Sequence, residues 1–340
     1  MDADRLRGLP KAELHQHLDG SLRLETAVDL ARAAGMPLTL DDARARMVGP
    51  VRCADQAQLL GFFDLPIALL QTASALERAA SELVDDLAAD GIRYAEVRWA
   101  PRLHLGEGLS VGDVIDAVVR GVTRRAEEGP LIGLIVTAMR SHPPAANAEL
   151  ARTAGAFGWP VIGFDLAGPE SAWPAPPHAI AFVAAREAGL ELTAHAGEVS
   201  GAQRVREVLE FGVRRVAHGV TATEDDAVLE MLRSRDVTLD LCPTSNVQAA
   251  VVPSLEAHPL AALHRAGVSV TISTDDRTVT GISLSQEMAR TATAQGLRRE
   301  ELAAIALNAF DRAFASRAAM APLAADARRA WDAWRRSPIS

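Results

Sequence analysis

Eight short stretches rich in β-branched and aliphatic residues recur along the chain, separated by segments with helical periodicity. Strands that alternate with helices favour right-handed βαβ units and a parallel sheet. Eight such units in 340 residues predict an α/β fold, a (β/α)8 TIM barrel. An open doubly wound sheet is the alternative, but no Gly-x-Gly-x-x-Gly motif follows any expected strand. The expected strands are 12–17, 92–99, 131–139, 161–167, 190–195, 213–218, 237–242 and 268–274.

The spacing of the expected strands also predicts the domain organisation. We expect one domain over residues 1–340, because no linker or low-complexity tract interrupts the pattern. The long gap after the first strand, 23–90, predicts a helical insert over the catalytic face, where Phe62 and Phe63 either line a pocket or form a helix-packing pair. Residues 285–336 predict extra C-terminal helices that close the barrel. Further helical periodicity is found at 75–90, 177–189, 201–212, 224–234 and 255–266.

Composition excludes several classes of protein. The net charge of −9, with no basic stripe, argues against a nucleic-acid partner. No apolar run approaches the length of a membrane span, and the charged amino terminus lacks the apolar core of a signal peptide, so we expect a cytoplasmic protein without a membrane partner. Cys53 and Cys242 are the only cysteines, which excludes a disulfide framework and a cysteine-rich zinc site.

A His-x-His pair lies in the first expected strand. Alternate residues of a strand point to the same face, so the imidazoles of His15 and His17 are expected to lie close enough to share one ion. Zinc accepts neutral imidazole nitrogens and carboxylate oxygens, and catalytic zinc sites leave one position for water. The pair alone is a weak signal, because two histidines in a strand can also be core residues.

Other polar side chains follow the ends of the expected strands. In barrel enzymes the working residues lie at the carboxyl ends of the strands, so these side chains should meet on one rim. The strand-end residues are His15, His17 and Asp19 on the first strand, His195 and Glu198 on the fifth, His218 on the sixth, and Asp275 and Asp276 on the eighth.

Ligand preference suggests how these groups divide their roles. His15, His17, His195 and Asp275 would supply three nitrogens and one oxygen to a single Zn²⁺, leaving a position for water, whose pKa a bound zinc ion lowers to roughly 7. Two roles remain: one group must hold the water, and an acid must protonate the substrate. His218 and Glu198 are free for these roles, and Asp276 is expected on the substrate side. The other histidines have no second ligand spaced to join them and are expected to be surface or packing residues: His104, His142, His178, His258 and His264.

The single lysine decides between one metal ion and two. Some barrel hydrolases with a His-x-His strand hold two metal ions, and a carboxylated lysine on the fourth strand bridges the two ions. Here the fourth expected strand, 161–167, has no lysine, and Lys11 precedes the first expected strand. The sequence therefore predicts a single-metal site.

Several motifs, in this order, resemble those of the adenosine deaminase family of the amidohydrolase superfamily. The resemblance covers roughly residues 8–315. The motifs that carry it are Leu9-Pro-Lys-Ala-Glu-Leu-His-Gln-His-Leu-Asp-Gly20, Arg93-Tyr-Ala-Glu-Val-Arg98, Phe164-Asp-Leu-Ala-Gly168, His195-Ala-Gly-Glu198, His218-Gly219, Cys242-Pro-Thr-Ser-Asn246 and Ser273-Thr-Asp-Asp276.

The resemblance implies hydrolytic deamination of a purine nucleoside, adenosine or 2′-deoxyadenosine, to inosine or 2′-deoxyinosine and ammonia. By similarity, Glu198 protonates ring N1, and a dry apolar site would keep its carboxyl group protonated. His218 would position the nucleophile and help to deprotonate water. Asp275 would bind the metal and accept a hydrogen bond from the nucleophile.

The resemblance also implies a set of substrate contacts. Asp276 would contact N7, and the backbone N–H of Gly168 would meet N3, where glycine permits a close approach. Asp19 would contact the ribose hydroxyls, with His17 near them. Many family members have proline where this chain has Arg277, and the change bears on the loop near the sugar.

Alternative functions stay open within and outside this family. Relatives specific for free adenine usually carry glutamate at the position of Asp19, so this residue favours a nucleoside. A 5′-substituted adenosine such as aminodeoxyfutalosine is a further possible substrate, because the 23–90 segment sets the length of the pocket. A catalytically idle binding homologue is the alternative from another class, and the complete set of chemical groups argues against it.

Overall fold

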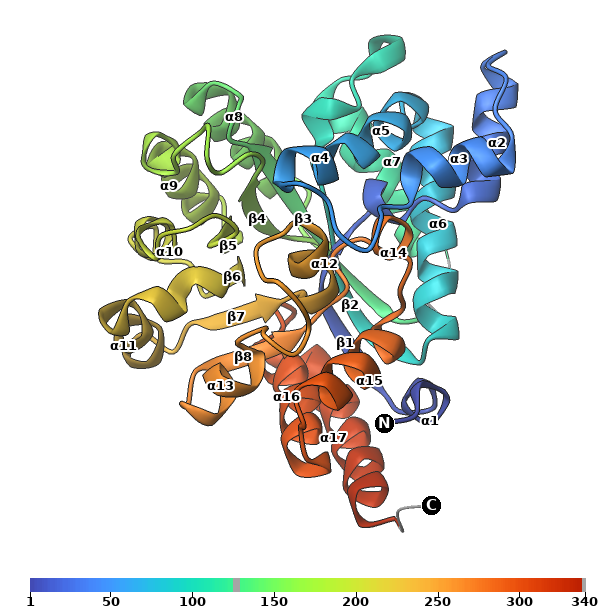
Figure 1. Ribbon diagram of the computed structural model, residues 1–340. Helices are drawn as coiled ribbons and strands as arrows, with labels where there is room; N and C mark the ends of the chain where they lie inside the picture. The colour runs from blue at the N-terminus through green and yellow to red at the C-terminus, as the bar shows by residue number, and fades with distance from the viewer. Residues whose placement is uncertain (125–128, 338–340) are drawn as a thin grey trace.

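The computed structural model describes residues 1–124 and 129–337, and one parallel sheet of eight strands in the order β1 to β8 forms its centre (Figure 1). The strands are β1 (Lys11–His17), β2 (Ile92–Trp99), β3 (Leu131–Met139), β4 (Val161–Ala167), β5 (Glu191–Ala196), β6 (Arg215–His218), β7 (Thr238–Leu241) and β8 (Ser269–Ile272). All eight expected strands are present within about two residues of the predicted bounds, and the (β/α)8 barrel is confirmed.

The barrel closes at a seam between β1 and the residues that follow β8. Gln16 forms an isolated parallel bridge with Asp275. The backbone N–H of His17 donates to the carbonyl of Asp275 at 2.7 Å, and the N–H of Asp275 donates to the carbonyl of His15 at 3.0 Å. Closure of the sheet therefore fixes the first and last strand-end residues against each other.

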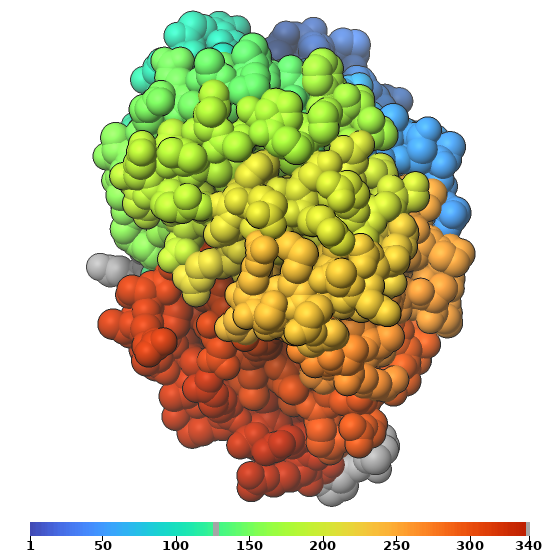
Figure 2. Space-filling view, turned by 90° about the vertical axis from the view of Figure 1, so that its left-hand side faces the viewer, coloured from blue at the N-terminus to red at the C-terminus, as the bar shows by residue number. Residues whose placement is uncertain are grey.

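Helices surround the barrel in the order that βαβ units require. Figure 2 faces the side where consecutive helices α8 to α11 lie next to one another above the C-terminal helices. The helix α16 packs against β1 and β8 and thereby covers the seam. The surrounding helices are α6 (Ala73–Ala89), α7 (Val111–Thr123), α8 (Pro144–Gly155), α9 (Ala179–Glu187), α10 (Gln203–Leu209), α11 (Asp226–Ser234), α13 (Leu260–Arg265), α15 (Leu284–Ala294), α16 (Arg299–Arg312) and α17 (Arg317–Arg336). Within the described part of the chain, no helix has the length and apolar character needed to cross a bilayer.

The segment between β1 and β2 contains two kinds of helix. Its last helix, α6, packs along α7 and β2 as an ordinary barrel helix. The short helices before it lie beside the rim, where η1 contacts α14 (Arg277–Thr280) and α5. These rim helices are η1 (Asp19–Ser21), α2 (Leu24–Ala33), α3 (Leu40–Met47), α4 (Gln56–Leu60), η2 (Gly61–Phe63) and α5 (Asp64–Leu69).

One helical expectation extends too far. The periodicity of 255–266 predicts a helix, but α13 begins at Leu260, and residues 255–259 form turns. Proline disfavours helical backbone in the residue before it, so Pro259 keeps His258 out of the helix. This boundary matters for the site, because His258 is buried next to it.

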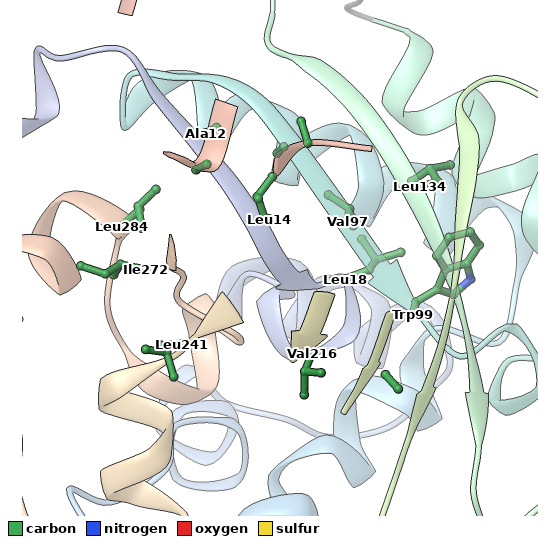
Figure 3. Close-up of a cluster of buried hydrophobic side chains, with 14 of the residues drawn as sticks. Ala12, Leu14, Leu18, Val97, Trp99, Leu134, Val216, Leu241, Ile272 and Leu284 are labelled. Atoms are coloured by element: carbon green, nitrogen blue, oxygen red, sulfur yellow. The ribbon is translucent and has the colours of Figure 1, made fainter. Parts of the chain in front are cut away.

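The interior combines an apolar core with a layer of buried ion pairs. Figure 3 shows a buried apolar cluster that includes Leu14, Val97 and Trp99 from β1 and β2. Inside the barrel, Arg215 is fully buried and pairs with Glu96 and, at 2.9 Å, with Asp240. A buried guanidinium held by two carboxylates leaves no charge unpaired, which is the condition for tolerating charges in a core.

Candidate active site

Three imidazoles and one carboxylate converge at the carboxyl ends of the strands. His15, His17, His195 and Asp275 each offer one ligand atom, and these atoms all lie within 4.8 Å of one another. The Nε2 atom of His17 lies 3.3 Å from Nε2 of His15 and 3.2 Å from Nε2 of His195. The Oδ1 atom of Asp275 lies 3.0 Å from Nε2 of His15 and 3.3 Å from Nε2 of His17. The structure thus brings together the four residues that the sequence predicts as ligands.

The backbone at this rim is unusual at two positions. His218 and Asp275 have positive φ angles, 65° and 66°, although neither is glycine. Such backbone is uncommon and costs on the order of 1–3 kcal/mol, so it persists where the surrounding structure holds it. The seam hydrogen bonds on both sides of Asp275 supply that support and turn its carboxylate toward the histidines.

The four groups fit one metal ion. Donor atoms at roughly 2.0–2.1 Å from one ion lie about 2.9–3.4 Å from one another at the angles of four- or five-coordination, and the four separations given above, 3.0–3.3 Å, fall in this range. Burial lowers the pKa of His15 and of His195, which favours the neutral imidazole that a metal binds. Three nitrogens and one carboxylate oxygen also form the donor set of a borderline metal.

Buried partners hold two of the candidate ligands. The Nδ1 atom of His195 lies 3.1 Å from Oδ1 of Asp165, a carboxylate on β4, so Nδ1–H donates and Nε2 is left free to face the cluster. The hydroxyl of Ser245 donates to Oδ2 of Asp275 at 2.7 Å. Such outer hydrogen bonds fix ring orientation and ligand basicity.

A cavity of about 180 Å³ opens beside the cluster. Its polar lining includes every residue assigned from the sequence to substrate or acid–base roles: His17, Asp19, Gly168, Glu198, His218 and Asp276. Its apolar wall is contributed largely by the rim helices: Leu59, Leu60, Phe63 and Ile67.

The two phenylalanines of the rim helices differ in role. Phe63 lines the cavity, and its ring lies edge-on to that of His17, with 6.4 Å between centroids. Both Phe62 and Phe63 also pack against a small buried cluster that includes Cys53 and Val279. Packing therefore applies to both residues, and pocket lining applies to Phe63.

Glu198 lies on the cavity wall with its carboxyl oxygen Oε2 3.4 Å from Nε2 of His218. Burial raises the pKa of Glu198 to about 7, and the nearby carboxylate of Glu170 acts in the same direction. Glu170 accepts the backbone N–H groups of Gly197 and Glu198 at 3.0 and 2.9 Å, which fixes the turn that carries the acid. A substantial fraction of Glu198 is therefore protonated at neutral pH.

Asp276 also lines the cavity. Burial, together with the neighbouring carboxylates of Asp275 and Asp19, raises the pKa of Asp276 well above the usual value. Its Oδ1 atom is buried and has no hydrogen-bond partner within the described residues. A side chain at Gly20 would collide with it, since an added Cβ would lie 2.0 Å from Oδ1. Glycine at position 20 thus leaves room for the carboxyl group of Asp276 beside the cavity.

Sequence reasoning missed several buried groups behind the cavity. Asp165, Asn246 and Glu170 contact site residues, and the motifs that carry the resemblance already contain Asp165 and Asn246. His258, expected to be a surface or packing residue, is buried and bonded to Asn246. Their roles depend on contacts between distant segments.

Two other unassigned groups have contacts of their own. His104 is also buried, with Nε2 3.7 Å from Oδ2 of Asp19. Lys11 donates to the carbonyls of Leu6 and Leu9, at 2.8 and 2.9 Å, which occupies its ammonium group away from the metal cluster.

Together the barrel and the rim define the class: an amidohydrolase-type deaminase, a hydrolase that acts on C–N bonds. Residues 10–327 match the family described as adenosine deaminase. The chain therefore belongs to the adenosine deaminase family.

Three proteins illustrate the similarity. An adenosine deaminase of Clostridium perfringens is 36% identical over 317 residues, covering 92% of this chain and 96% of its own. The structure of an adenine deaminase from Arthrobacter aurescens superposes with a TM-score of 0.88 at 28% identity, covering 94% of this chain and 98% of its own. An amidohydrolase from Burkholderia ambifaria, solved with bound Zn, gives a TM-score of 0.89 at 25% identity, with coverage of 97% and 93%.

Proposed function

We propose that this chain is a zinc-dependent deaminase that converts adenosine or 2′-deoxyadenosine, with water, to inosine or 2′-deoxyinosine and ammonia. The observation that carries the proposal is that the partly buried acid Glu198 and the four-residue ligand cluster face the same small cavity. Membership of the adenosine deaminase family supports the same reaction. Free purine bases and modified adenosines are the competing substrates within this class.

The cluster of His15, His17, His195 and Asp275 would hold the zinc ion. When bound, zinc supplies a water molecule acidified enough to act as a nucleophile near neutral pH. The bound Zn of the structurally similar amidohydrolase favours zinc over other borderline metals.

Glu198 acts as the acid. A purine with an amino group at C6 becomes more electrophilic there when ring N1 receives a hydrogen bond or a proton. The raised pKa of Glu198, about 7, keeps the carboxyl group available as a donor at the pH where the nucleophile forms. A carboxylate with an ordinary pKa would be ionised and could offer N1 only repulsion.

Asp276 and Gly168 orient the base. Ring N7 is a hydrogen-bond acceptor, so a carboxyl group that meets it must be protonated, which agrees with the raised pKa of Asp276. Gly168 has a φ of 110°, a conformation that residues with a Cβ rarely adopt, and it lines the cavity where its N–H could meet N3. Two donors on opposite edges would fix the ring relative to Glu198.

The sugar end and the apolar wall complete the pocket. Asp19 and His17 lie together on the lining and would receive the ribose hydroxyls. The apolar side chains of the rim helices would exclude bulk water from the reacting ring, which strengthens every electrostatic interaction inside. We also propose a cytoplasmic location, with which the free thiols of Cys53 and Cys242 agree.

Comparison of substrates tests the proposal. The zinc-loaded chain is offered adenosine, 2′-deoxyadenosine, adenine and a 5′-substituted adenosine at equal concentration, and ultraviolet absorbance follows the loss of the 6-amino group. We expect the highest kcat/KM with adenosine or 2′-deoxyadenosine. A preference for adenine would move the chain to the alternative substrate, and the absence of turnover with all four would favour an idle binding protein.

A further inference from the structure

A line of three hydrogen bonds runs from the start of α13 to His218. The backbone N–H of Leu260 donates to Nδ1 of His258 at 3.2 Å. The Nε2 atom of His258 lies 3.0 Å from Oδ1 of Asn246, and Nδ2 of Asn246 lies 3.0 Å from Nδ1 of His218. His258, Asn246 and His218 are all at least 95% buried, so water does not compete with these bonds.

The direction of every bond in this line follows from its first donor. Leu260 is the first residue of α13, and the first N–H groups of a helix have no partner inside it. A backbone N–H can only donate, so Nδ1 of His258 must be the acceptor and carries no proton. Burial lowers the pKa of His258 to about 3, so the ring is neutral and its single proton lies on Nε2.

The orientation of the Asn246 amide is then fixed. His258 Nε2–H donates, so it must face the amide oxygen, and the amide nitrogen must face His218. The amide nitrogen can only donate, so Nδ1 of His218 accepts and carries no proton. A flipped amide would set its NH₂ group against the Nε2–H of His258, two donors facing each other in a buried site where an unpaired donor is costly.

We propose that His258 and Asn246 are positioning residues that hold His218 in the tautomer with its proton on Nε2, so that His218 meets the nucleophile as a hydrogen-bond donor. The nitrogen that carries this proton faces the site, 3.4 Å from Oε2 of Glu198 and 3.7 Å from Oδ2 of Asp275. This inference rests on the proposed function and revises the role of His218. The resemblance assigns it to deprotonation of water, whereas Nε2 in this tautomer has no lone pair with which to take a proton.

The tautomer can be measured directly. Chains labelled with ¹⁵N-histidine are compared by NMR with and without zinc, because protonated and unprotonated ring nitrogens have widely separated ¹⁵N shifts. The His218 signals are identified by their loss in His218→Gln. We expect Nε2 protonated and Nδ1 unprotonated, and a proton on Nδ1 of His218 would overturn the proposal. This measurement needs no turnover, so it tests the inference even if adenosine is not the substrate.

Asn246→Asp reverses the direction of the hydrogen bond to His218 and keeps the shape of the side chain. An aspartate accepts at both ends, so it still pairs with His258 but requires His218 to place a proton on Nδ1. We expect the NMR tautomer to change and kcat to fall about 100-fold, the loss typical when one preorganised donor is removed, with little change in KM. A kcat close to that of the parent chain, with the tautomer inverted, would refute the donor role.

The chain provides a matched control. Asn147 donates to Nδ1 of the buried His178 at 3.0 Å, and Nε2 of His178 faces the carbonyl of Arg140 at 3.1 Å. Asn147→Asp therefore adds the same charge to the same kind of pair outside the reacting site, and kcat should stay near the parent value. An equal loss in both variants would assign the effect to buried charge and would contradict the proposal.

Substitutions at His258 keep the test decisive if Asn246→Asp fails to fold. His258→Gln retains an amide donor for Oδ1 of Asn246, whereas His258→Leu removes it. We expect the leucine variant to show both His218 tautomers and a lower kcat, and the glutamine variant to recover most of the loss. A single Nε2–H tautomer in the leucine variant would show that His258 does not hold it.

Discussion

Replacement of Asp165 tests how the barrel orients His195, a candidate metal ligand. Asp165 contacts no substrate-facing atom of the cluster, but its carboxylate accepts from Nδ1 of His195 at 3.1 Å and from the hydroxyl of Thr137 at 3.2 Å. Burial alone would raise the pKa of Asp165, but its interactions with His195 and with the charge of Arg98 lower it well below the usual value, so the side chain is an anion. Its removal should weaken metal binding rather than the acid chemistry.

The size of the loss in zinc affinity depends on whether each substitution leaves a hydrogen-bond acceptor for His195. Asp165→Asn keeps an acceptor for His195 and loses the charge, and Arg98 retains the carbonyl of Leu14 at 2.8 Å. Asp165→Ala also loses the acceptor, so the ring can rotate. Changes in such outer partners cost about 10–100-fold in metal affinity, or about 1.4–2.7 kcal/mol. We expect Asp165→Asn to weaken zinc binding about 10-fold and Asp165→Ala to weaken it about 100-fold.

The assay is a competition for zinc. Each purified variant is titrated with zinc in the presence of a chromophoric chelator, and urea unfolding of the metal-free chains reports stability separately. Thr137→Val removes only the hydroxyl bond to Asp165 and should change the zinc dissociation constant less than Asp165→Asn. An alanine variant that folds and binds zinc as tightly as the parent chain would refute the proposed orientation of His195.

Four further outcomes are expected from the site. Glu198→Gln should retain zinc but lose about 10²–10⁴ in kcat, and near-normal turnover would remove its role as the acid. The pKa of Glu198 is raised to about 7, so the protonated acid predominates only below pH 7. We therefore expect kcat/KM to fall about tenfold per pH unit above pH 7, and a flat profile between pH 7 and 9 would contradict this. Asp275→Ala should weaken zinc retention, which metal analysis after dialysis measures, and unchanged stoichiometry would exclude it as a ligand. Asp19→Glu should reduce activity on adenosine more than on adenine, whereas equal losses would undo its assignment to the sugar.

The barrel could be predicted because its signals are local. The first strand, β1, shows an alternation of apolar and polar residues, and the other strands contain β-branched residues of their own. The polar residues of the site lie at the ends of these strands, as His195 and His218 do. Strand ends of a barrel share one rim, so position in the sequence was sufficient to collect the candidate ligands. The beginning of α13 was predicted too early because periodicity alone does not register the effect of Pro259 on its neighbour.

The supporting groups could not be found in the same way. Asp165 supports His195 across 30 positions of sequence, and Asn246 supports His218 across 28. No spacing rule connects such pairs, because their contact depends on which strands are neighbours and how deep each side chain lies. The signals available for Asp165 were its place in the middle of an apolar strand and in a motif that carries the family resemblance.

The seam between β1 and the residues after β8 has a consequence for the order of events in folding. His15 and His17 lie on the first strand, but the carboxylate that completes the candidate ligand cluster, and the backbone groups that hold it there, belong to Asp275 beyond the eighth strand. A partly folded chain therefore carries only part of this ligand set until the barrel closes. If the cluster holds the proposed zinc ion, we expect tight capture of the ion to follow closure of the sheet rather than to precede it.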